Sequence, residues 1–159
     1  MGAPAFVAIH RLGALQAGPR GHALRDVRGL GGDGGWWILD ETELHLGGEC
    51  LVPDLAGWRR ERMPALPSEA FFSQPPDWIC EVLSSNRADD LVKKMRLYHQ
   101  AQVPHYWIID PEVETLSVYR WVEGGYLHVL GATRNERVRA EPFAALPLDA
   151  LPEPQIGRA

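Results

Sequence analysis

Lysine is the scarcest charged residue in this chain. Only Lys93 and Lys94 occur, side by side, and every other basic residue among the sixteen is an arginine. The formal net charge is −5, which argues against a protein that coats nucleic acid through a broad basic surface. It does not exclude an enzyme that acts on nucleic acid, because the acids of a metal site lower the total charge. Because lysine is so rare in this chain, we use the position of Lys93 and Lys94 as an indication of function.

Cysteine and long apolar segments are scarce as well. The two cysteines, Cys50 and Cys80, are too few for a disulfide framework. Both lie in apolar runs, so we expect two small buried side chains in a reducing cytoplasm. No apolar run approaches the ~20 residues of a membrane span, and residues 1–11 lack the pattern of a signal peptide. We therefore expect a cytoplasmic protein without membrane contact.

The composition is that of one globular domain, with 159 residues of which 45% are hydrophobic and 23% charged. More than half of the glycines lie before residue 36, so we expect this segment to be loop-like, apart from a short helix over Ala5–Gln16. Three parts are predicted: a divergent N-terminal segment over 1–35, a folded domain over 36–148, and an irregular tail over 149–159.

From residue 36 the pattern becomes that of strands around one helix. Residues 88–102 have the period of an amphipathic helix, with Leu91, Met95 and Tyr98 on its apolar side. Gly47-Gly48 is typical of a hairpin turn. The predicted strands cover 36–39, 43–46, 50–52, 77–83, 105–109, 115–121 and 126–130. This order predicts an α/β fold, a mixed sheet with a crossover helix.

Two acids and a lysine form a candidate site. Asp54 closes one apolar run, and Glu81 points with its strand's alternate residues into apolar surroundings. An acid there is costly unless it has a cation or a hydrogen-bond partner. Mg²⁺ prefers carboxylate oxygens, and an ammonium group such as that of Lys94 can offset charge that develops on a phosphate. The three residues together predict metal-dependent hydrolysis of phosphodiesters.

Each of these residues also has an ordinary structural interpretation. Glu81 could pair with an arginine, Asp54 could organise a turn after Pro53, and Lys94 could be a solvated helix residue. A second functional hypothesis is a catalytically inactive nucleic-acid-binding or protein-interaction module on the same fold. Metal affinity separates the hypotheses, because only the enzyme requires a cation at Asp54 and Glu81.

Four segments resemble a known family. They include a strand that ends in Glu-Val-Leu-Ser and a block Tyr-Trp-Ile-Ile-Asp-Pro, and they lie at 52–55, 76–84, 90–98 and 103–111. They are similar to the bacterial putative restriction endonucleases of the Uma-two type, within the PD-(D/E)xK nuclease superfamily. The resemblance covers about residues 36–148 and implies a restriction-endonuclease-like α/β fold.

The resemblance also implies roles for individual residues. Asp54 and Glu81 would bind Mg²⁺ (or Mn²⁺), with the backbone carbonyl of Val82 as a further ligand. The superfamily lysine usually lies two residues after the glutamate, where this chain has Leu83. Lys94 would take over its role.

Two helix residues complete this site. Lys94 lies four residues before Tyr98 and one helical turn after Asp90, which matches the family pattern. Asp90 would position the lysine through an i, i+4 contact, and Tyr98 would support the site from the same helix.

DNA is the partner that this site implies. Candidate contacts to its backbone are Arg59, Arg60, Arg62, Arg87 and Lys93. The sequence leaves open whether the protein forms a homodimer. Other metal chemistry has little support in the sequence, because the six histidines show no metal-ligand spacing and no Cys-x-x-Cys occurs.

Overall fold

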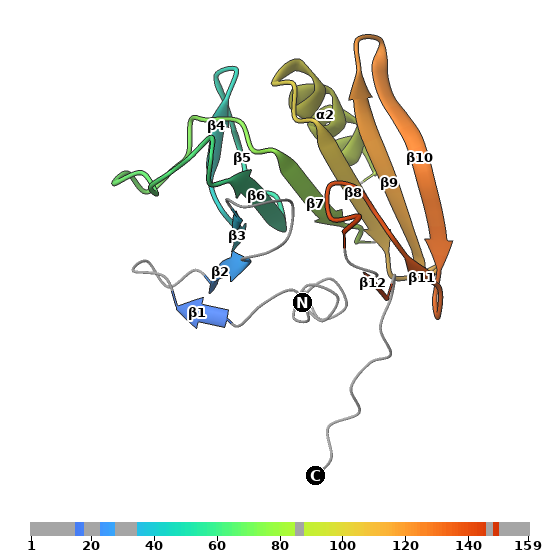
Figure 1. Ribbon diagram of the computed structural model, residues 1–159. Coiled ribbons are helices and arrows are strands. Elements are labelled where there is room, and N and C mark those ends of the chain that lie inside the picture. Colours follow the sequence, from blue (N-terminus) through green and yellow to red (C-terminus); the bar gives the residue numbers. More distant parts are fainter. Residues whose placement is uncertain (1–14, 18–22, 28–34, 85–87, 146–147, 150–159) are drawn as a thin grey trace.

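A mixed sheet of eight strands runs through the computed structural model, which describes residues 15–17, 23–27, 35–84, 88–145 and 148–149 (Figure 1). The strand order is β1-β2-β3-β6-β7-β8-β9-β10. Among the described strands of this sheet, β7 and β8 are the only pair that runs in parallel, and helix α2 lies between them in the chain. This arrangement confirms the predicted mixed sheet with a crossover helix. The elements are β1 (Leu15–Ala17), β2 (Ala23–Val27), β3 (Trp36–Asp40), β6 (Leu55–Arg59), β7 (Trp78–Val82), α2 (Ala88–Gln100), β8 (His105–Asp110), β9 (Thr115–Val122) and β10 (Gly125–Thr133).

The sheet extends further toward the N-terminus than the sequence indicated. β1 pairs with β2, and β2 pairs with β3, all antiparallel. The expected helix over Ala5–Gln16 is wrong at its end, because Leu15 and Gln16 belong to β1; residues 1–14 lie outside the described part. The glycines that suggested a loop come before β1 or between these strands in the sequence, and Ala23–Val27 contains none. Pairing with β3 satisfies the backbone N–H and C=O groups of β2. A local sequence pattern cannot show that such a partner strand exists.

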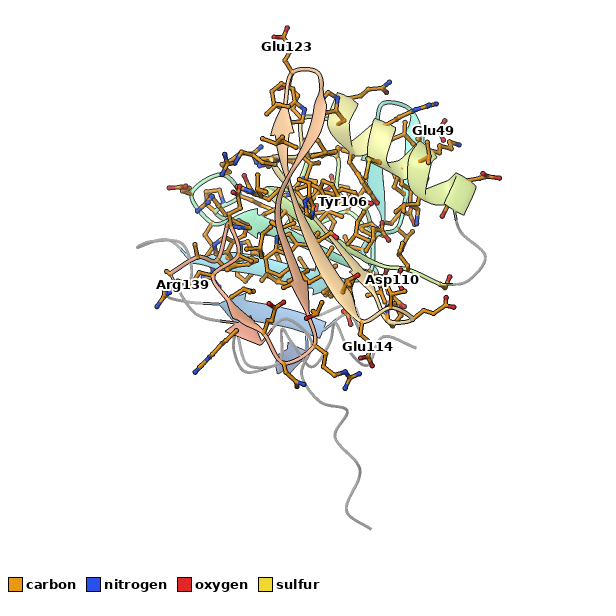
Figure 2. All side chains as sticks on the ribbon, turned by 90° about the vertical axis from the view of Figure 1, so that its right-hand side faces the viewer. Glu49, Tyr106, Asp110, Glu114, Glu123 and Arg139 are labelled. Atoms are coloured by element: carbon orange, nitrogen blue, oxygen red, sulfur yellow. The ribbon has the colours of Figure 1, made fainter. Side chains whose placement is uncertain are left out.

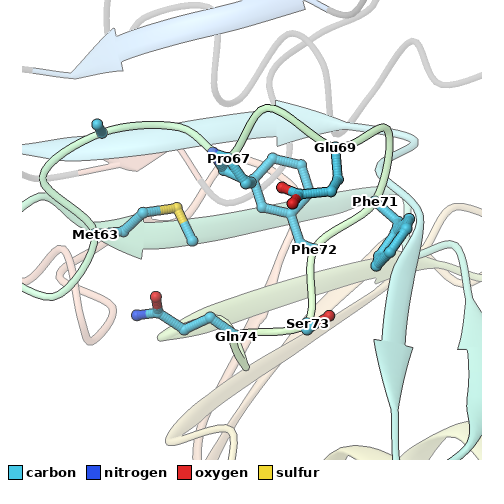
Figure 3. A pocket seen from close by; sticks show the side chains of 8 residues that line it. Met63, Pro67, Glu69, Phe71, Phe72, Ser73 and Gln74 are labelled. Atoms are coloured by element: carbon cyan, nitrogen blue, oxygen red, sulfur yellow. The ribbon is translucent and has the colours of Figure 1, made fainter.

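The β4–β5 hairpin projects from this sheet as a separate two-stranded unit, with β4 over Leu44–Leu46 and β5 over Glu49–Leu51 (Figure 1). Gly47 and Gly48 form its turn with φ of 59° and 81°, which glycine adopts without strain. The long connection over 60–76 packs beside the hairpin, where Phe72 and Leu44 form a bridge. That connection lines an open cavity of about 430 Å³ (Figure 3).

The two cysteines differ in environment. Cys80 is fully buried in the sheet, as expected, but Cys50 is exposed. The expectation for Cys50 was wrong because Leu51, its neighbour, takes the buried face of the hairpin, and successive strand residues point to opposite faces. Both thiols are free.

The core has one cluster on each face of the sheet. Trp78 packs edge-on against Trp107 and Phe143 on the face opposite α2, with ring centroids 5.2 and 5.1 Å away. On the other face, Ile79 of the sheet and Tyr98 of the helix belong to the second cluster. The predicted apolar side of the helix is confirmed, because Leu91, Met95 and Tyr98 all belong to this second cluster.

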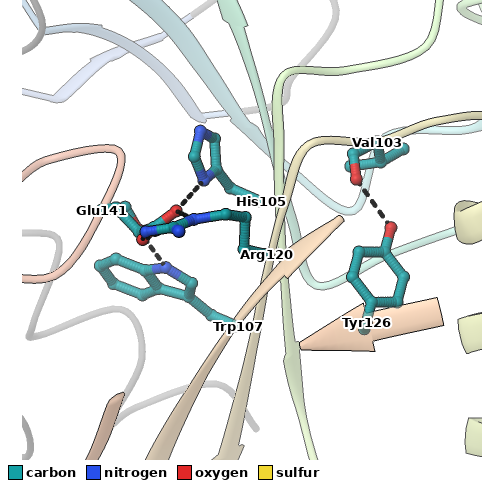
Figure 4. Close-up of polar contacts among 6 residues, drawn as sticks. All are labelled: Val103, His105, Trp107, Arg120, Tyr126 and Glu141. Carbon is teal, nitrogen blue, oxygen red and sulfur yellow. Dashed lines mark hydrogen bonds and ion pairs between the residues drawn. The ribbon is translucent and has the colours of Figure 1, made fainter. Parts of the chain in front are cut away.

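Glu141 ties the C-terminal segment to the sheet (Figure 4). Its carboxylate accepts hydrogen bonds from the Arg120 guanidinium and lies 3.0 Å from His105 Nδ1, and its carbonyl accepts one from Trp107 Nε1 at 2.8 Å. Burial lowers the pKa of His105, although Glu141 opposes this effect. The segment continues into a short ladder of β11 (Arg137–Val138) and β12 (Leu148–Asp149). Among the described residues, no helix is long and apolar enough to cross a membrane.

Candidate functional site

Strand pairing brings Asp54 and Glu81 together. Asp54 immediately precedes β6, which runs antiparallel to β7 with Leu55 opposite Cys80, so Asp54 lies beside the end of β7. Its Oδ2 accepts a hydrogen bond from Val82 N at 2.7 Å. Asp54 therefore contacts the residue that follows Glu81, although 27 positions separate the two acids in the sequence.

Glu81 is buried beneath α2. It is 3% exposed, and its side chain points to the face that also holds Ile79 and Leu83, as the alternation predicted. Tyr98 Oη donates a hydrogen bond to Glu81 Oε1 at 2.8 Å, and Lys94 Nζ lies 3.7 Å from the same oxygen. The helix thus supplies both a donor and a cation to a carboxylate that the sheet buries.

Lys94 lies between two acids. Its ammonium is 3.3 Å from Asp90 Oδ2, one turn earlier in α2, and its side chain is only 13% exposed. The i, i+4 contact between Asp90 and Lys94 is present as predicted. By contrast, Lys93 is 63% exposed and reaches Glu49 of the hairpin at 3.6 Å. A helix turns about 100° per residue, which explains why adjacent lysines have such different environments.

The electrostatics of this group disfavour two ionised carboxylates side by side. Burial raises the pKa of Glu81 to about 7, while Lys94 and Tyr98 act in the opposite direction. Asp54 adds to the increase through its charge and through a hydrogen bond between the two carboxyl groups. Two close carboxylates repel each other when both are ionised. A divalent cation would relieve this repulsion, which the ammonium of Lys94 only partly offsets.

The arginines that follow Asp54 in the sequence lie away from it in space. Asp54 precedes the first residue of β6 and Arg59 is its last, so about 16 Å of strand separates them. Arg59 lies over the Trp36 ring at 4.5 Å, and Arg60 over the Trp37 ring at 3.7 Å. Arg87 falls outside the described residues. Closeness to Asp54 in the sequence therefore did not predict closeness to the candidate site in space.

Asp77 is a buried acid that the sequence pattern did not single out as a candidate. It is 4% exposed, and its carboxylate accepts hydrogen bonds from Arg62 Nη1 at 2.5 Å and from Arg59 N at 2.8 Å. Arg62, expected to contact DNA, thus closes the long connection against the start of β7. One feature of the sequence indicates this role: Asp77 comes directly before a buried strand, where a charged group needs a partner.

We expect Arg62→Met to destabilise the fold. Removing the guanidinium leaves the buried Asp77 carboxylate with less compensation, and because Arg62 is 43% exposed the loss in the free energy of unfolding should be about 1–3 kcal/mol, below that of a fully buried pair. Urea unfolding measures it, with Arg96→Met as the control because Arg96 is an exposed residue of α2. Equal stability of the two variants would show that the Arg62–Asp77 pair contributes nothing.

The described elements form an α/β domain in which Glu81 of β7 meets Lys94 and Tyr98 of α2, with Asp54 directly before the neighbouring strand β6. Residues 21–150 match the model of the Uma2 family, whose description is putative restriction endonuclease. The chain belongs to this family. The match begins before residue 36 and so includes β2.

A solved structure has a similar fold. It is the crystal structure of a putative nuclease belonging to DUF820 from Anabaena variabilis ATCC 29413, with a TM-score of 0.56 and 24% sequence identity. The similarity covers 72% of this chain and 65% of that chain, less than two thirds of its length. No curated protein matches the sequence. The family description thus names a restriction endonuclease, and the solved structure supports the fold.

Proposed function

We propose that this protein is a Mg²⁺-dependent (or Mn²⁺-dependent) DNA endonuclease that uses Asp54, Glu81 and Lys94. The observation that carries the proposal is the convergence of three elements on one buried carboxylate. Lys94 Nζ lies 3.7 Å from Glu81 Oε1, and Asp54 contacts the next residue of β7 at 2.7 Å.

The donor set suits a hard cation. Asp54 and Glu81 offer carboxylate oxygens, and Mg²⁺ commonly takes one or two of these together with water and substrate phosphate. The N–H and C=O of one strand residue point toward the same neighbouring strand. Because Val82 N donates to Asp54, its carbonyl faces the same side and is the proposed further ligand. Tyr98 and Lys94 contact Oε1 of Glu81, which leaves Oε2 for the cation.

The bound metal would polarise the phosphate and lower the pKa of the attacking water. Lys94, held by Asp90 and Glu81, would donate hydrogen bonds to that water and to the phosphate oxygens, where negative charge develops. Tyr98 would keep the Glu81 carboxylate in one orientation through its 2.8 Å hydrogen bond. Asp90 would hold the ammonium of Lys94 at the site.

Contacts to the DNA backbone would come from outside this group. Lys93 is exposed on the same helix as Lys94 and is the proposed contact nearest to the cleavage site. Arg59, Arg60, Arg62 and Arg87 remain proposed contacts. Arg59 would reach phosphates farther along the DNA, because it lies at the opposite end of β6 from Asp54, and Arg62 would have to leave Asp77 to bind phosphate.

Glu81→Gln tests the proposal. The amide keeps an oxygen for the Tyr98 hydroxyl but removes an anionic ligand, so we expect Mg²⁺ or Mn²⁺ affinity to fall by at least about tenfold and cleavage of plasmid DNA to be lost. Calorimetric titration and a nicking assay measure the two effects. Glu123→Gln is the control, since Glu123 lies at the tip of the β9–β10 hairpin (Figure 2).

The same experiment separates the two functional hypotheses. DNA binding by the wild type without metal affinity or cleavage would overturn the endonuclease and favour the inactive binding module. Equal metal affinity in the wild type and Glu81→Gln would place the cation elsewhere.

A further inference from the structure

A glutamate, a histidine and an exposed cysteine meet on the β4–β5 hairpin. The ligand atoms of Glu43, His45 and Cys50 all lie within 4.8 Å of one another. His45 Nε2 is 2.6 Å from Glu43 Oε1, and Glu43 also shares a hydrogen bond with the Cys50 thiol. Free cysteines are among the most buried residues in proteins, so an exposed one beside two further metal-ligand types is unusual.

The register of the hairpin creates this group. His45 lies directly opposite Cys50 in the β4–β5 ladder, and cross-strand partners share a face with Cβ atoms ~5 Å apart. Glu43 is two residues before His45 and points the same way. The alternate residues Leu44, Leu46 and Leu51 are buried on the other face. No sequence spacing signals the group, because the turn at Gly47 and Gly48 brings the ligands together.

The imidazole of His45 is already oriented. It stacks on the Phe71 ring with centroids 4.0 Å apart and planes 8° from parallel. Phe71 comes from the long connection over 60–76 and also lines its cavity (Figure 3). The stack fixes the plane of the imidazole while Nε2 faces Glu43. Less conformational freedom is then lost when a cation binds.

We propose that Glu43, His45 and Cys50 bind a divalent cation of the zinc type. Tetrahedral zinc, with bonds of 2.0–2.3 Å, places its ligand atoms about 3.3–3.7 Å apart. Small rotations of three partly exposed side chains reach that spacing from separations within 4.8 Å. The cation replaces the thiol proton and leaves a fourth position for water. Thiolate and imidazole favour Zn²⁺ and Co²⁺ over Mg²⁺.

This group is separate from the candidate nuclease site. Glu49, on the opposite face of the hairpin, contacts Lys93 of α2 at 3.6 Å (Figure 2). That contact marks the face of the hairpin that is turned toward the helix and Lys94. Glu43, His45 and Cys50 point to the other face. The zinc proposal therefore does not depend on the proposed endonuclease function.

Cobalt is the probe that tests the proposal, because a cobalt–thiolate bond adds a near-ultraviolet absorption band. The full chain, kept reduced with a phosphine, is titrated with Co²⁺ and then with Zn²⁺. We expect one band-forming site, displacement of Co²⁺ by Zn²⁺, and no displacement by excess Mg²⁺. Cys50→Ser should abolish the band, and His45→Ala should weaken Co²⁺ binding by at least about tenfold.

Two matched variants serve as controls. Glu49→Gln changes an acid on the other face of the same hairpin, and Glu81→Gln removes the carboxylate of the candidate nuclease site; both should keep the wild-type band and affinity. No band in the wild type would overturn the proposal. A band whose affinity His45→Ala leaves unchanged would also overturn it, because it would report a simple thiolate adduct. Circular dichroism checks that each variant is folded.

Discussion

Lys94→Ala is expected to reduce DNA cleavage by about 10²–10³-fold, the cost of losing one contact to the charge of the transition state. Mg²⁺ affinity should stay nearly unchanged, because Asp54 and Glu81 remain, and the fold should persist with some loss of stability, because Lys94 pairs with buried Glu81. The basis is position: the Lys94 ammonium lies 3.7 Å from buried Glu81, and its side chain is 13% exposed. Single-turnover nicking of plasmid DNA at saturating Mn²⁺ or Mg²⁺ measures the effect.

Lys93→Ala is the matched control for this experiment. Lys93 is the adjacent residue in the same helix, but its side chain is 63% exposed and contacts Glu49 of the hairpin. We expect only modestly weaker DNA binding and a shallower salt dependence, the signature of a lost phosphate contact. If both alanine variants cleave equally well, Lys94 is not the catalytic lysine. If both lose activity equally, the two lysines act together on phosphate.

Without metal, the protein should become less stable as pH rises from about 4.5 to about 7. Burial is the main cause that raises the pKa of Glu81 in the folded state from its ordinary value of 4.5 to about 7. Between these values the folded state binds the proton that the unfolded state has released, so the free energy of unfolding falls with pH. The loss attributable to Glu81 is on the order of 3 kcal/mol.

Comparison with Glu81→Gln isolates this effect from other titrating groups. His105, for example, acts in the opposite direction, since its lowered pKa favours the folded state as pH rises. In a chelator, the stability of Glu81→Gln relative to the wild type should increase between pH 4.5 and pH 8, and denaturant unfolding at several pH values measures it. A constant difference across that range would contradict the raised pKa.

Bound metal should restore the stability that is lost at higher pH in the wild type but not in Glu81→Gln. At 100 times its dissociation constant, a ligand that binds only the folded state adds about 2.7 kcal/mol. The gain should be largest above pH 7, where Glu81 is ionised in the folded protein and binds a cation without losing a proton. Equal stabilisation of Glu81→Gln by Mg²⁺ would contradict the assignment of this carboxylate as a ligand.

Much of the central fold could be predicted from the sequence because local patterns are strong there. The alternation around Glu81 correctly placed it on the face shared with Ile79 and Leu83. The helical period correctly placed Lys94 one turn from Asp90 and four residues before Tyr98. The Gly47-Gly48 turn was predicted for the same reason, since both residues require positive φ.

Other features depended on contacts between distant segments. Ala23–Val27 forms a strand because β3 offers it backbone partners, and a count of nearby glycines cannot reveal that. Arg62 binds Asp77 rather than remaining a free surface cation, because the long connection folds back on β7. Cys50 is exposed beside His45 because the hairpin register sets which cross-strand pairs face the core and which face away from it.

The sequence by itself determined the residue types of the candidate nuclease site and the elements that carry them. Periodicity fixes which way a side chain leaves its own strand or helix. Only the tertiary structure decided that Asp54 lies beside the end of β7, that the Tyr98 hydroxyl reaches Glu81, and that Lys94 is largely buried while Lys93 is not. These relations depend on strand pairing and helix packing between residues far apart in the chain, and burial then raises the pKa of Glu81.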